Sequence, residues 1–228
     1  NGNREYISKL DGQLIVYQAK SDFLINASRI SRDRLAAIKR IDGVADAGML
    51  GTSNATLVNE TLKTPLKVAL LGIDVGHVGE PKVVEGTQLS TNQADEVIID
   101  RATQLRTDLK VGDNVTLRVT QGTKDEFFNL RIVGISDGQQ YSLQPSIFVP
   151  FYTWDRIRPK SEAEVNNSSP VPNVMMVKLS DPKTIDQVSA AITSQVKDVE
   201  VATIKQAISA LPGYSAQQST LNTQGGFT

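Results

Sequence analysis

The sequence predicts an α+β fold in which two β-α-β units form one discontinuous layer and hold a small, mainly β subdomain between them. Three observations predict this: the order strand, helix, strand at 14–47, the same order at 174–202, and a densely patterned β stretch at 97–151. Because neither unit can bury its sheet face alone, we expect the two units to pair, with their helices on one face. The central stretch is then an insertion.

The first unit opens with the apolar run 14–17, which predicts a buried strand. Ser31 is a suitable N-cap for a helix that ends at Gly43. The apolar stripe of this helix consists of Leu35, Ile38 and Ile41. We expect this stripe to pack on a sheet.

Strand patterns dominate the residues that follow. Residues 44–58 are strand-like but interrupted by Gly48 and Gly51, and 66–73 predicts a further strand. The fully apolar run 97–99 is typical of a strand buried on both faces. A short helix is expected next, with its apolar positions at Ala102, Leu105 and Leu109.

The rest of the central stretch predicts a small β structure. Apolar and polar residues alternate at 115–120 and again at 128–135, which predicts two half-buried strands. The residues between them, 121–124, predict a short turn. A last strand is expected at 146–150.

The second unit follows a polar connector at 161–172, which lacks periodicity and is expected to be a flexible link. A strand is predicted at 173–179, after which Asp181 caps a helix that Pro182 starts. The apolar stripe of this helix consists of Ile185, Val188, Ile192 and Val196. Residues 199–201 then predict another strand.

Composition excludes several classes of function. The 24 Lys and Arg residues and the 25 Asp and Glu residues give a net charge of -1, which argues against a nucleic-acid partner. The chain has no cysteine, so it has no disulfide, thiolate nucleophile or Cys-ligated metal, and its single histidine excludes a multi-histidine metal site. No apolar run approaches the roughly 20 residues that a membrane helix needs. Taken alone, the sequence predicts a soluble protein without a signal peptide.

No set of residues predicts catalysis, a cofactor or a metal site. His77 lies in a glycine-rich stretch with the carboxylates of Asp74 and Glu80, but a turn after a strand accounts for the same pattern. The adjacent pairs 95–96 and 125–126 are carboxylates that point to opposite sides of the chain. We therefore expect solvated surface at both pairs.

One loop is a candidate for contact with a partner protein. The segment 136–145 is polar and is expected to be exposed, yet it carries aromatic and aliphatic side chains of the kind that partner contacts use. The expected contact residues are Gln140, Tyr141, Leu143 and Gln144. The alternative is that Tyr141 and Leu143 fold back on the small core of the insertion.

The ordered runs VIID at 97–100, LKVGDNVTL at 109–117, FNLRIVGI at 128–135 and SIFVPFYTW at 146–154 also carry a family resemblance. In this order they resemble the extracytoplasmic core domain of MacB-type ABC transporter permeases, a group that includes FtsX-like and lipoprotein-exporting permeases. The resemblance covers most of the chain and is one of pattern, because no single motif in it is diagnostic.

The resemblance implies a domain organisation and a location. Residues 1–85 and 160–214 would form a discontinuous porter-like subdomain, and 86–159 an inserted Sabre-like subdomain. Residues 215–228 would lead into a membrane helix of the parent protein. The domain would lie outside the cytoplasm, between the first and second membrane helices of a bacterial inner-membrane permease.

The resemblance also implies a function without catalysis. Such a domain would transmit ATP-driven motion from a cytoplasmic ATPase subunit, act beside a second permease copy as a homodimer or heterodimer, and contact an adaptor or the exported substrate. The lipoprotein-exporting branch has an extended hairpin that hooks a carrier protein, where this chain has only the turn 121–124. A MacB-type periplasmic adaptor is therefore the favoured partner, and FtsX-like activation of a cell-wall hydrolase is an alternative.

Two hypotheses from other classes stay open on the sequence alone. One is a free-standing secreted module that binds a ligand or acts in adhesion, and the other is a hydrolase. Apolar helices encoded immediately outside the chain would support the permease.

Overall fold

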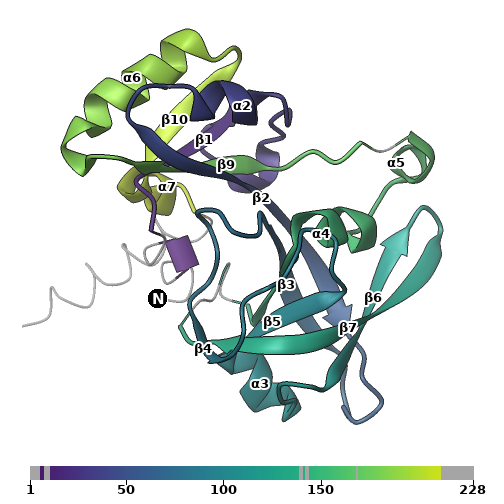
Figure 1. Cartoon of the computed structure of the whole chain (residues 1–228). Coiled ribbons are helices and arrows are strands. Elements are labelled where there is room, and N and C mark those ends of the chain that lie inside the picture. The colour runs from purple at the N-terminus through teal and green to yellow at the C-terminus, as the bar shows by residue number, and fades with distance from the viewer. Residues whose placement is uncertain (1–5, 8–10, 139–140, 142–143, 168, 212–228) are drawn as a thin grey trace, which may run out of the picture.

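The computed structural model describes residues 6–7, 11–138, 141, 144–167 and 169–211. Figure 1 shows two lobes that lie side by side and share the long strand β2 (Val44–Leu57). A single 10-stranded sheet runs through both lobes, in the order β10-β1-β9-β2-β3-β8-β5-β7-β4, with β6 paired to β2 and β7. The two lobes are therefore joined by backbone hydrogen bonds as well as by side chains.

The first lobe contains both predicted β-α-β units. Its elements are β1 (Leu14–Gln18), η1 (Ile25–Ala27), α2 (Arg34–Lys39), the first half of β2, β9 (Val174–Leu179), η2 (Pro182–Thr184), α6 (Ile185–Gln195), β10 (Val199–Thr203) and α7 (Ile204–Ser209). β1 lies between β10 and β9 and is antiparallel to both, and β9 is antiparallel to β2. This is the strand order of the ferredoxin-like split β-α-β fold. We call it the ferredoxin-like lobe.

The second lobe is a closed ring of strands. Its elements are the second half of β2, β3 (Leu66–Ile73), β4 (Val83–Gly86), β5 (Glu96–Asp100), α3 (Arg101–Thr107), β6 (Asn114–Gln121), β7 (Lys124–Ser136), β8 (Ser146–Pro150), α4 (Phe151–Ile157) and α5 (Glu162–Asn167). β6 pairs with β7 along its whole length and returns to the end of β2, where Leu57 lies opposite Leu117. The ring β2-β3-β8-β5-β7-β6 thus closes, and we call it the barrel lobe.

Buried hydrophobic side chains hold the elements of both lobes together. Alternate residues of β1 point to opposite faces of the sheet: Leu14 and Val16 join the cluster that contains Ile38 of α2 and Ile192 of α6. Ile15 and Tyr17 join a second cluster. The first cluster continues into the barrel interior, so the two lobes share one core.

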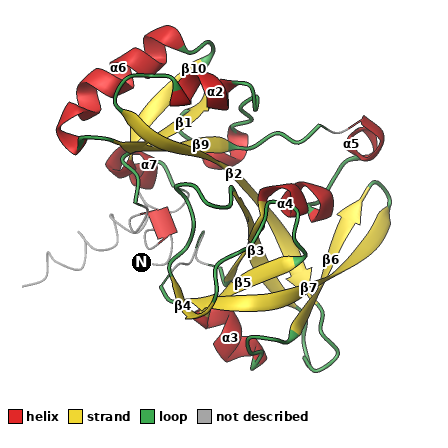
Figure 2. Ribbon diagram, viewed as in Figure 1, coloured by secondary structure: helices red, strands yellow, loops and turns green. Residues whose placement is uncertain are grey.

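Figure 2 shows helices on both faces of the ferredoxin-like sheet: the helices of the two β-α-β units lie together on one face, as expected, and α7 lies on the other. α2 and α6 share one face, whereas Ala207 of α7 packs in the second cluster with Tyr6 and Ile7. The physical reason is that β1 is buried on both sides, since Leu14 to Tyr17 are all fully buried. A one-sided helix layer would leave the side chains of Ile15 and Tyr17 in water.

Two local predictions are wrong. α3 buries Thr103 and Thr107, while Leu105 of the expected apolar stripe is 78% exposed. The threonine face of the helix is buried because the Asp100 side chain fixes the start of α3 beside β8. One oxygen of Asp100 accepts from the Thr103 N–H at 2.6 Å, and the other accepts from the Ser146 N–H at 2.9 Å. The connector 161–172, expected to lack structure, contains the helix α5.

β2 is one continuous strand, although its glycines were expected to interrupt it. Leu50 pairs with Val174 of β9 on one side and with Ile73 of β3 on the other, so the strand changes neighbours there without breaking. A Cβ at Gly48 would lie 2.5 Å from the Val78 carbonyl oxygen. The glycine therefore permits close approach of a neighbouring loop.

The sheet runs across the predicted subdomain boundary at residue 85. β3 belongs to the chain assigned to the porter-like part, yet it pairs in parallel with β8 of the inserted part. In the structure, β3 is a wall of the barrel. The division into 1–85, 86–159 and 160–214 stays a prediction, and the segment 215–228 lies outside the described residues.

Candidate functional site

The predicted partner loop is only partly described. Gln140 and Leu143 lie outside the described residues. Tyr141 is 4% exposed, so its expected exposure is wrong. It packs in the cluster that contains Tyr17 of one lobe and Phe148 of the other, and its N–H donates to Ser146 Oγ at 2.8 Å. Tyr141 thus sits between the lobes and not in a core belonging to the insertion alone. Gln144 is half-buried, and contact of this loop with a partner stays a prediction.

His77 does not form the carboxylate set considered from the sequence. Its Nδ1 lies 2.8 Å from Asp46 Oδ1 on β2, and the second oxygen of Asp46 accepts from the Val78 N–H at 2.8 Å. Asp74 instead accepts from the Met49 N–H and from the side-chain amide of Asn92. The contacts of His77 and Val78 with Asp46 therefore hold the loop after β3 against β2.

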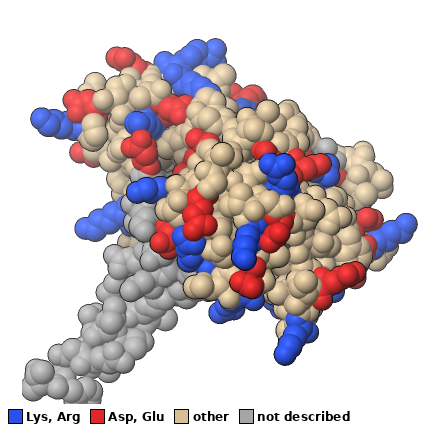
Figure 3. All heavy atoms as spheres, turned by 60° about the horizontal axis from the view of Figure 1, so that its bottom comes forward, with Lys and Arg blue, Asp and Glu red and all other residues tan. Residues whose placement is uncertain are grey.

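The adjacent carboxylates hold separate partners. Asp95 pairs with Arg156, whereas Glu96 accepts from the N–H and the hydroxyl of Ser90. Among the described residues, no group of His, Cys, Asp and Glu is arranged to hold a metal ion. On the face drawn in Figure 3, cationic and anionic side chains are interspersed over both lobes.

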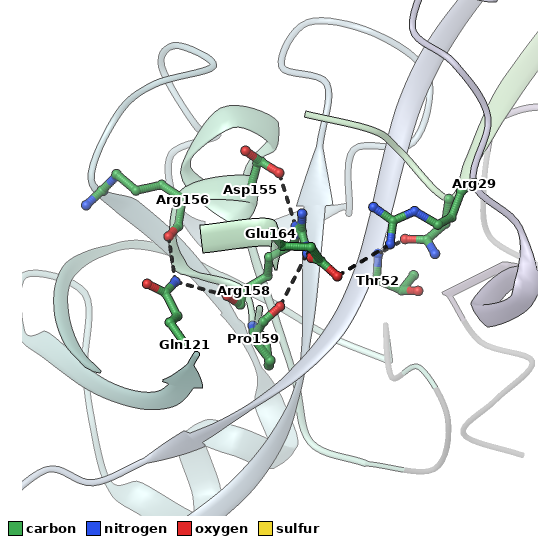
Figure 4. Close-up of polar contacts among 9 residues, drawn as sticks. Arg29, Thr52, Gln121, Asp155, Arg156, Arg158, Pro159 and Glu164 are labelled. Carbon is green, nitrogen blue, oxygen red and sulfur yellow. Dashed lines mark hydrogen bonds and ion pairs between the residues drawn. The ribbon is translucent and has the colours of Figure 1, made fainter. Parts of the chain in front are cut away.

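The contact between the lobes contains a polar arrangement that the sequence did not predict. A cavity of about 240 Å³ opens there. The lining residues that matter below are Arg29, Thr52, Ser53, Trp154, Arg158 and Glu164. Figure 4 shows Arg158 beside Glu164, which reaches toward Arg29 on the opposite lobe.

Trp154 forms one wall of this cavity. Gly51 and Gly72 lie opposite each other on β2 and β3. A Cβ at Gly51 would lie 2.5 Å from the indole, and one at Gly72 would lie 2.4 Å from Trp154 Cβ. The side chain of Trp154 on α4 therefore packs directly against the backbone of the two glycines, a contact surface that we call the glycine seat. The tryptophan is 3% exposed.

Arg158 lies over this indole, with its guanidinium carbon 5.5 Å from the ring centroid. The residue is 6% exposed. Its Nε donates to Asp155 Oδ1 at 3.1 Å, and its Nη1 donates to Glu164 Oε2 at 2.6 Å and to the Pro159 carbonyl at 3.3 Å. A buried charge needs such partners to be tolerated.

Glu164 connects the two lobes. Its second oxygen lies 4.0 Å from Nη1 of Arg29, which follows η1 in the ferredoxin-like lobe. The hydrogen bond from Arg158 lowers the pKa of Glu164 below its usual value. A second bridge lies nearby, because Arg32 of the ferredoxin-like lobe donates to the Tyr152 hydroxyl of α4 at 3.2 Å.

Three buried polar atoms from cavity-lining residues have no hydrogen-bond partner within the described part of the protein. They are Arg158 Nη2, Trp154 Nε1 and Ser53 Oγ. Each of these atoms can donate a hydrogen bond, and each is closed off from solvent. The only sequence signals were the single tryptophan and Gly51, which was noted as an interruption of a strand.

With this geometry established, the class of protein is clear. The chain matches the family described as MacB-like periplasmic core domain over residues 1–195. Because the match covers most of the chain, the chain belongs to this family, whose domains lie outside the inner membrane in full-length ABC transporter permeases. No curated protein matched the chain.

Two solved structures share the fold. One is the extracellular domain of the noncanonical ABC-type transporter YknZ from Gram-positive bacteria, with a TM-score of 0.58 and 13% identity over 83% of this chain and 99% of that chain. The other is the periplasmic region of MacB from Actinobacillus actinomycetemcomitans, with a TM-score of 0.58 and 12% identity over 96% of this chain and 97% of that chain. The α+β fold class predicted from the sequence is confirmed. Within the described residues, no helix has the length and apolar character required to span a bilayer.

Proposed function

We propose that this chain is a non-catalytic extracytoplasmic element that carries ATP-driven motion from the membrane part of a permease to its barrel lobe. The observation that carries this proposal is the position of the first and last described segments. Tyr6 and Ile7 pack in the same cluster as Ala207 and Leu211, and Tyr6 also contacts Phe148 of β8. Helices attached before and after the domain would therefore both act close to the contact between the two lobes.

The connection between the lobes supports transmission as a semi-rigid body. β2 passes from one lobe to the other without a break, and one hydrophobic core extends through both. The side-chain bridges Arg29–Glu164–Arg158 and Arg32–Tyr152 lie across the same contact. A displacement of the ferredoxin-like lobe is then expected to move the barrel lobe with it.

The partners proposed for this element follow from the family. They are a cytoplasmic ATPase, reached through the full-length permease, a second permease copy, and a periplasmic adaptor that the barrel lobe would contact. The turn between β6 and β7 is short, since Gln121 pairs with Lys124, which supports an adaptor over a hooked carrier protein. Activation of a cell-wall hydrolase is the alternative outcome of a partner search.

Cross-linking in the parent transporter tests the mechanical role. The chain has no cysteine, so single cysteines at strongly exposed positions, such as Leu105→Cys at 78% exposure and Phe127→Cys at 59%, report on contacts between two copies. A verified cross-link between the two domains is expected to suppress transport and alter ATP turnover, with recovery on reduction. Full transport and unchanged ATP turnover in the cross-linked dimer would show that the domain is a passive docking surface.

A further inference from the structure

We propose that the space between β2 and β6, on the outer wall of the barrel lobe, is a docking site for an extended, acidic segment of a partner protein. The inference rests on the proposed function in one respect, namely that the barrel lobe meets another protein. Three observations carry it: a strand edge that is open at Asn54, two cations without an ion pair among the described residues, and a groove that both border.

The ladder of backbone hydrogen bonds beside β2 is interrupted between its two neighbours. On the side away from β3, β2 pairs with β9 as far as Leu50 and with β6 from Thr56 onward. Between these positions, Thr52 donates its N–H to Asn173 Oδ1 at 2.8 Å. Asn54 has no hydrogen-bond partner on this side within the described part of the chain. Because the backbone groups of alternate residues point to the same side of a strand, the N–H and C=O of Asn54 face the space between β2 and β6.

β6 leaves β2 at the same level. In an unbroken ladder Thr120 would lie opposite Asn54, two residues beyond the pair of Thr56 and Arg118. The Thr120 carbonyl instead accepts from the Lys160 N–H at 3.2 Å. The two strands therefore separate, and a cavity of about 580 Å³ opens there. We call it the β2–β6 groove, and its lining includes Asn54, Thr56, Lys67, Arg118 and Thr120.

Two cations lie in one row across this surface. Thr56 pairs with Lys67 of β3 on one side and with Arg118 of β6 on the other. Side chains that lie directly opposite on neighbouring strands point to the same face of a sheet. The chain neighbours Ala55 and Leu117 belong to the barrel core, so the row faces outward. Two strand spacings place the Cα atoms of Lys67 and Arg118 roughly 10 Å apart.

The charge of the groove favours an acidic occupant. Neither Lys67 nor Arg118 forms an ion pair with another described residue. Among the described lining residues the one carboxylate is that of Asp125, which accepts from the Thr120 hydroxyl at 3.1 Å. Gln144, a contact residue predicted from the sequence, lines the same groove and is uncharged. The groove therefore keeps a net positive charge.

The open edge and the two cations together define the kind of partner. An unpaired strand edge binds an extended segment through its backbone, and the side chains beside the edge select among such segments. In an extended segment, carboxylates on alternate residues lie about 7 Å apart, a spacing that the long side chains of lysine and arginine can meet. A basic segment would pair with the same edge but would be repelled by both cations.

A titration of the full 228-residue chain with a synthetic peptide tests the proposal. The peptide is a hexapeptide of alternating threonine and glutamate, blocked at both ends. In a proton–nitrogen correlation spectrum it is expected to shift the backbone amides of Asn54, Thr56 and Arg118 saturably, with a Kd on the order of 100 µM because the contact is short. The same peptide with glutamine in place of glutamate is expected to bind about tenfold more weakly.

Two further peptides test the strand edge itself. Each carries N-methyl groups on one of the two sets of alternate residues, so each lacks the hydrogen-bond donors of one edge. Pairing with β2 uses one edge of the added strand, so one methylated form is expected to bind and the other to lose binding. Equal binding by the two forms would show that the cations attract the peptide without the strand edge, and the proposal would be wrong.

Surface variants test the cations. Arg118→Gln and Lys67→Gln are each expected to weaken binding of the acidic peptide about fivefold, because each removes one charge partner. Arg131→Gln is the matched control, since Arg131 is an exposed cation on the same hairpin that does not line the groove. It is expected to change the Kd by less than about twofold. Equal losses in the three variants would mean that the peptide responds to overall charge, which contradicts a specific site.

The titration separates this inference from the mechanical role. It uses the isolated chain, so it requires no motion and no ATPase. If no acidic peptide binds while the cross-linked transporter loses transport, the docking site is wrong and the mechanical role stands. If the peptide binds as expected while cross-linking leaves transport and ATP turnover unchanged, the docking site stands and the mechanical role is wrong.

Discussion

Arg158 keeps its charge at a position that is 6% exposed, and its neighbours explain how. The indole of Trp154 covers one face of the guanidinium, while Asp155 and Glu164 accept from two of its nitrogens. A buried cation loses its hydration, so each of these contacts replaces part of what water provided. Removing one partner leaves the charge less well compensated.

Glu164→Gln is therefore expected to lower the free energy of unfolding at pH 7 by about 1–2 kcal/mol. The hydrogen bond from Arg158 lowers the pKa of the folded-state carboxyl below the unfolded value of 4.5. This stabilisation is complete above pH 4.5 and is lost as the pH falls through the folded-state pKa. The difference between wild type and variant should then shrink at low pH, as measured by urea unfolding at pH 7 and pH 3.

Glu162→Gln serves as the matched control for this measurement, because Glu162 lies on the same helix. It should leave the free energy of unfolding within about 0.5 kcal/mol of wild type. An equal loss of stability in the two variants would mean that the bond to Arg158 contributes nothing specific.

At the scale of single residues, the sequence predicted little of this site. Trp154 and Arg158 are close in the chain, but no helix was predicted from the sequence at 151–157, where α4 places the tryptophan. Their burial was not predictable, because it depends on Gly51 and Gly72, which belong to strands far away in the sequence. Tyr141 shows the same limit, since its partners Tyr17 and Phe148 come from different lobes.

At the scale of elements, α4 is held on the barrel by the glycine seat. Gly51→Ala is expected to destabilise the protein by about 2–3 kcal/mol, because its Cβ would lie 2.5 Å from the indole and force α4 outward. Thermal or urea unfolding measures the loss. The indole fluorescence should change as well, since the ring loses its close contact with β2.

A double-mutant cycle separates this clash from a general effect on the strand. In a Trp154→Leu background the smaller side chain makes room, so Gly51→Ala should cost about 1 kcal/mol or less. Strictly additive losses would show that the alanine acts on β2 itself and not through α4.

Strands were easier to predict than helix faces. Alternating or continuous apolar runs predicted β1, β3, β5, β6, β7, β8, β9 and β10, because burial on a sheet leaves a period of two or a short apolar run. The stripe of α3 failed because Thr103 and Thr107 bury hydroxyls that bond to backbone carbonyls of Ser146 and Thr103. Such contacts leave no apolar signal in the sequence.

At the scale of the whole molecule, the chain leaves the ferredoxin-like lobe and returns to it at two positions that lie side by side. The Asn173 N–H donates to the Leu50 carbonyl at 2.9 Å, and Leu50 pairs with Val174. Replacing 51–173 by Asn-Gly would join β2 to β9 through a two-residue hairpin turn. We expect this shortened chain to keep its helical signal and to unfold cooperatively in urea.

Deleting 86–159 instead is the informative comparison. That cut follows the boundaries predicted from the sequence, but it removes β8 and leaves β3 without its parallel neighbour. It should yield a less stable product than the cut at Leu50. A shortened chain without cooperative unfolding in the first case would mean that the ferredoxin-like lobe depends on the barrel.

The pairing of the two β-α-β units was predictable because each alone would expose a sheet face. The closure of the barrel was not, because it depends on the return of β6 to the end of β2 through Leu57 and Leu117. That contact joins strands with separate hydrophobic patterns. Neither pattern identifies its neighbour.

The position of β1 between β9 and β10 has a consequence for the order of events during synthesis. Synthesis proceeds from the N-terminus, so β1 is made early. Both of its neighbours, β9 and β10, are among the last elements made. The barrel strands are all synthesised in between, so their ring can form while β1 still lacks its neighbours. The nascent chain must keep Ile15 and Tyr17 from aggregating over that interval, and folding of the lobe ends only with the C-terminal strand.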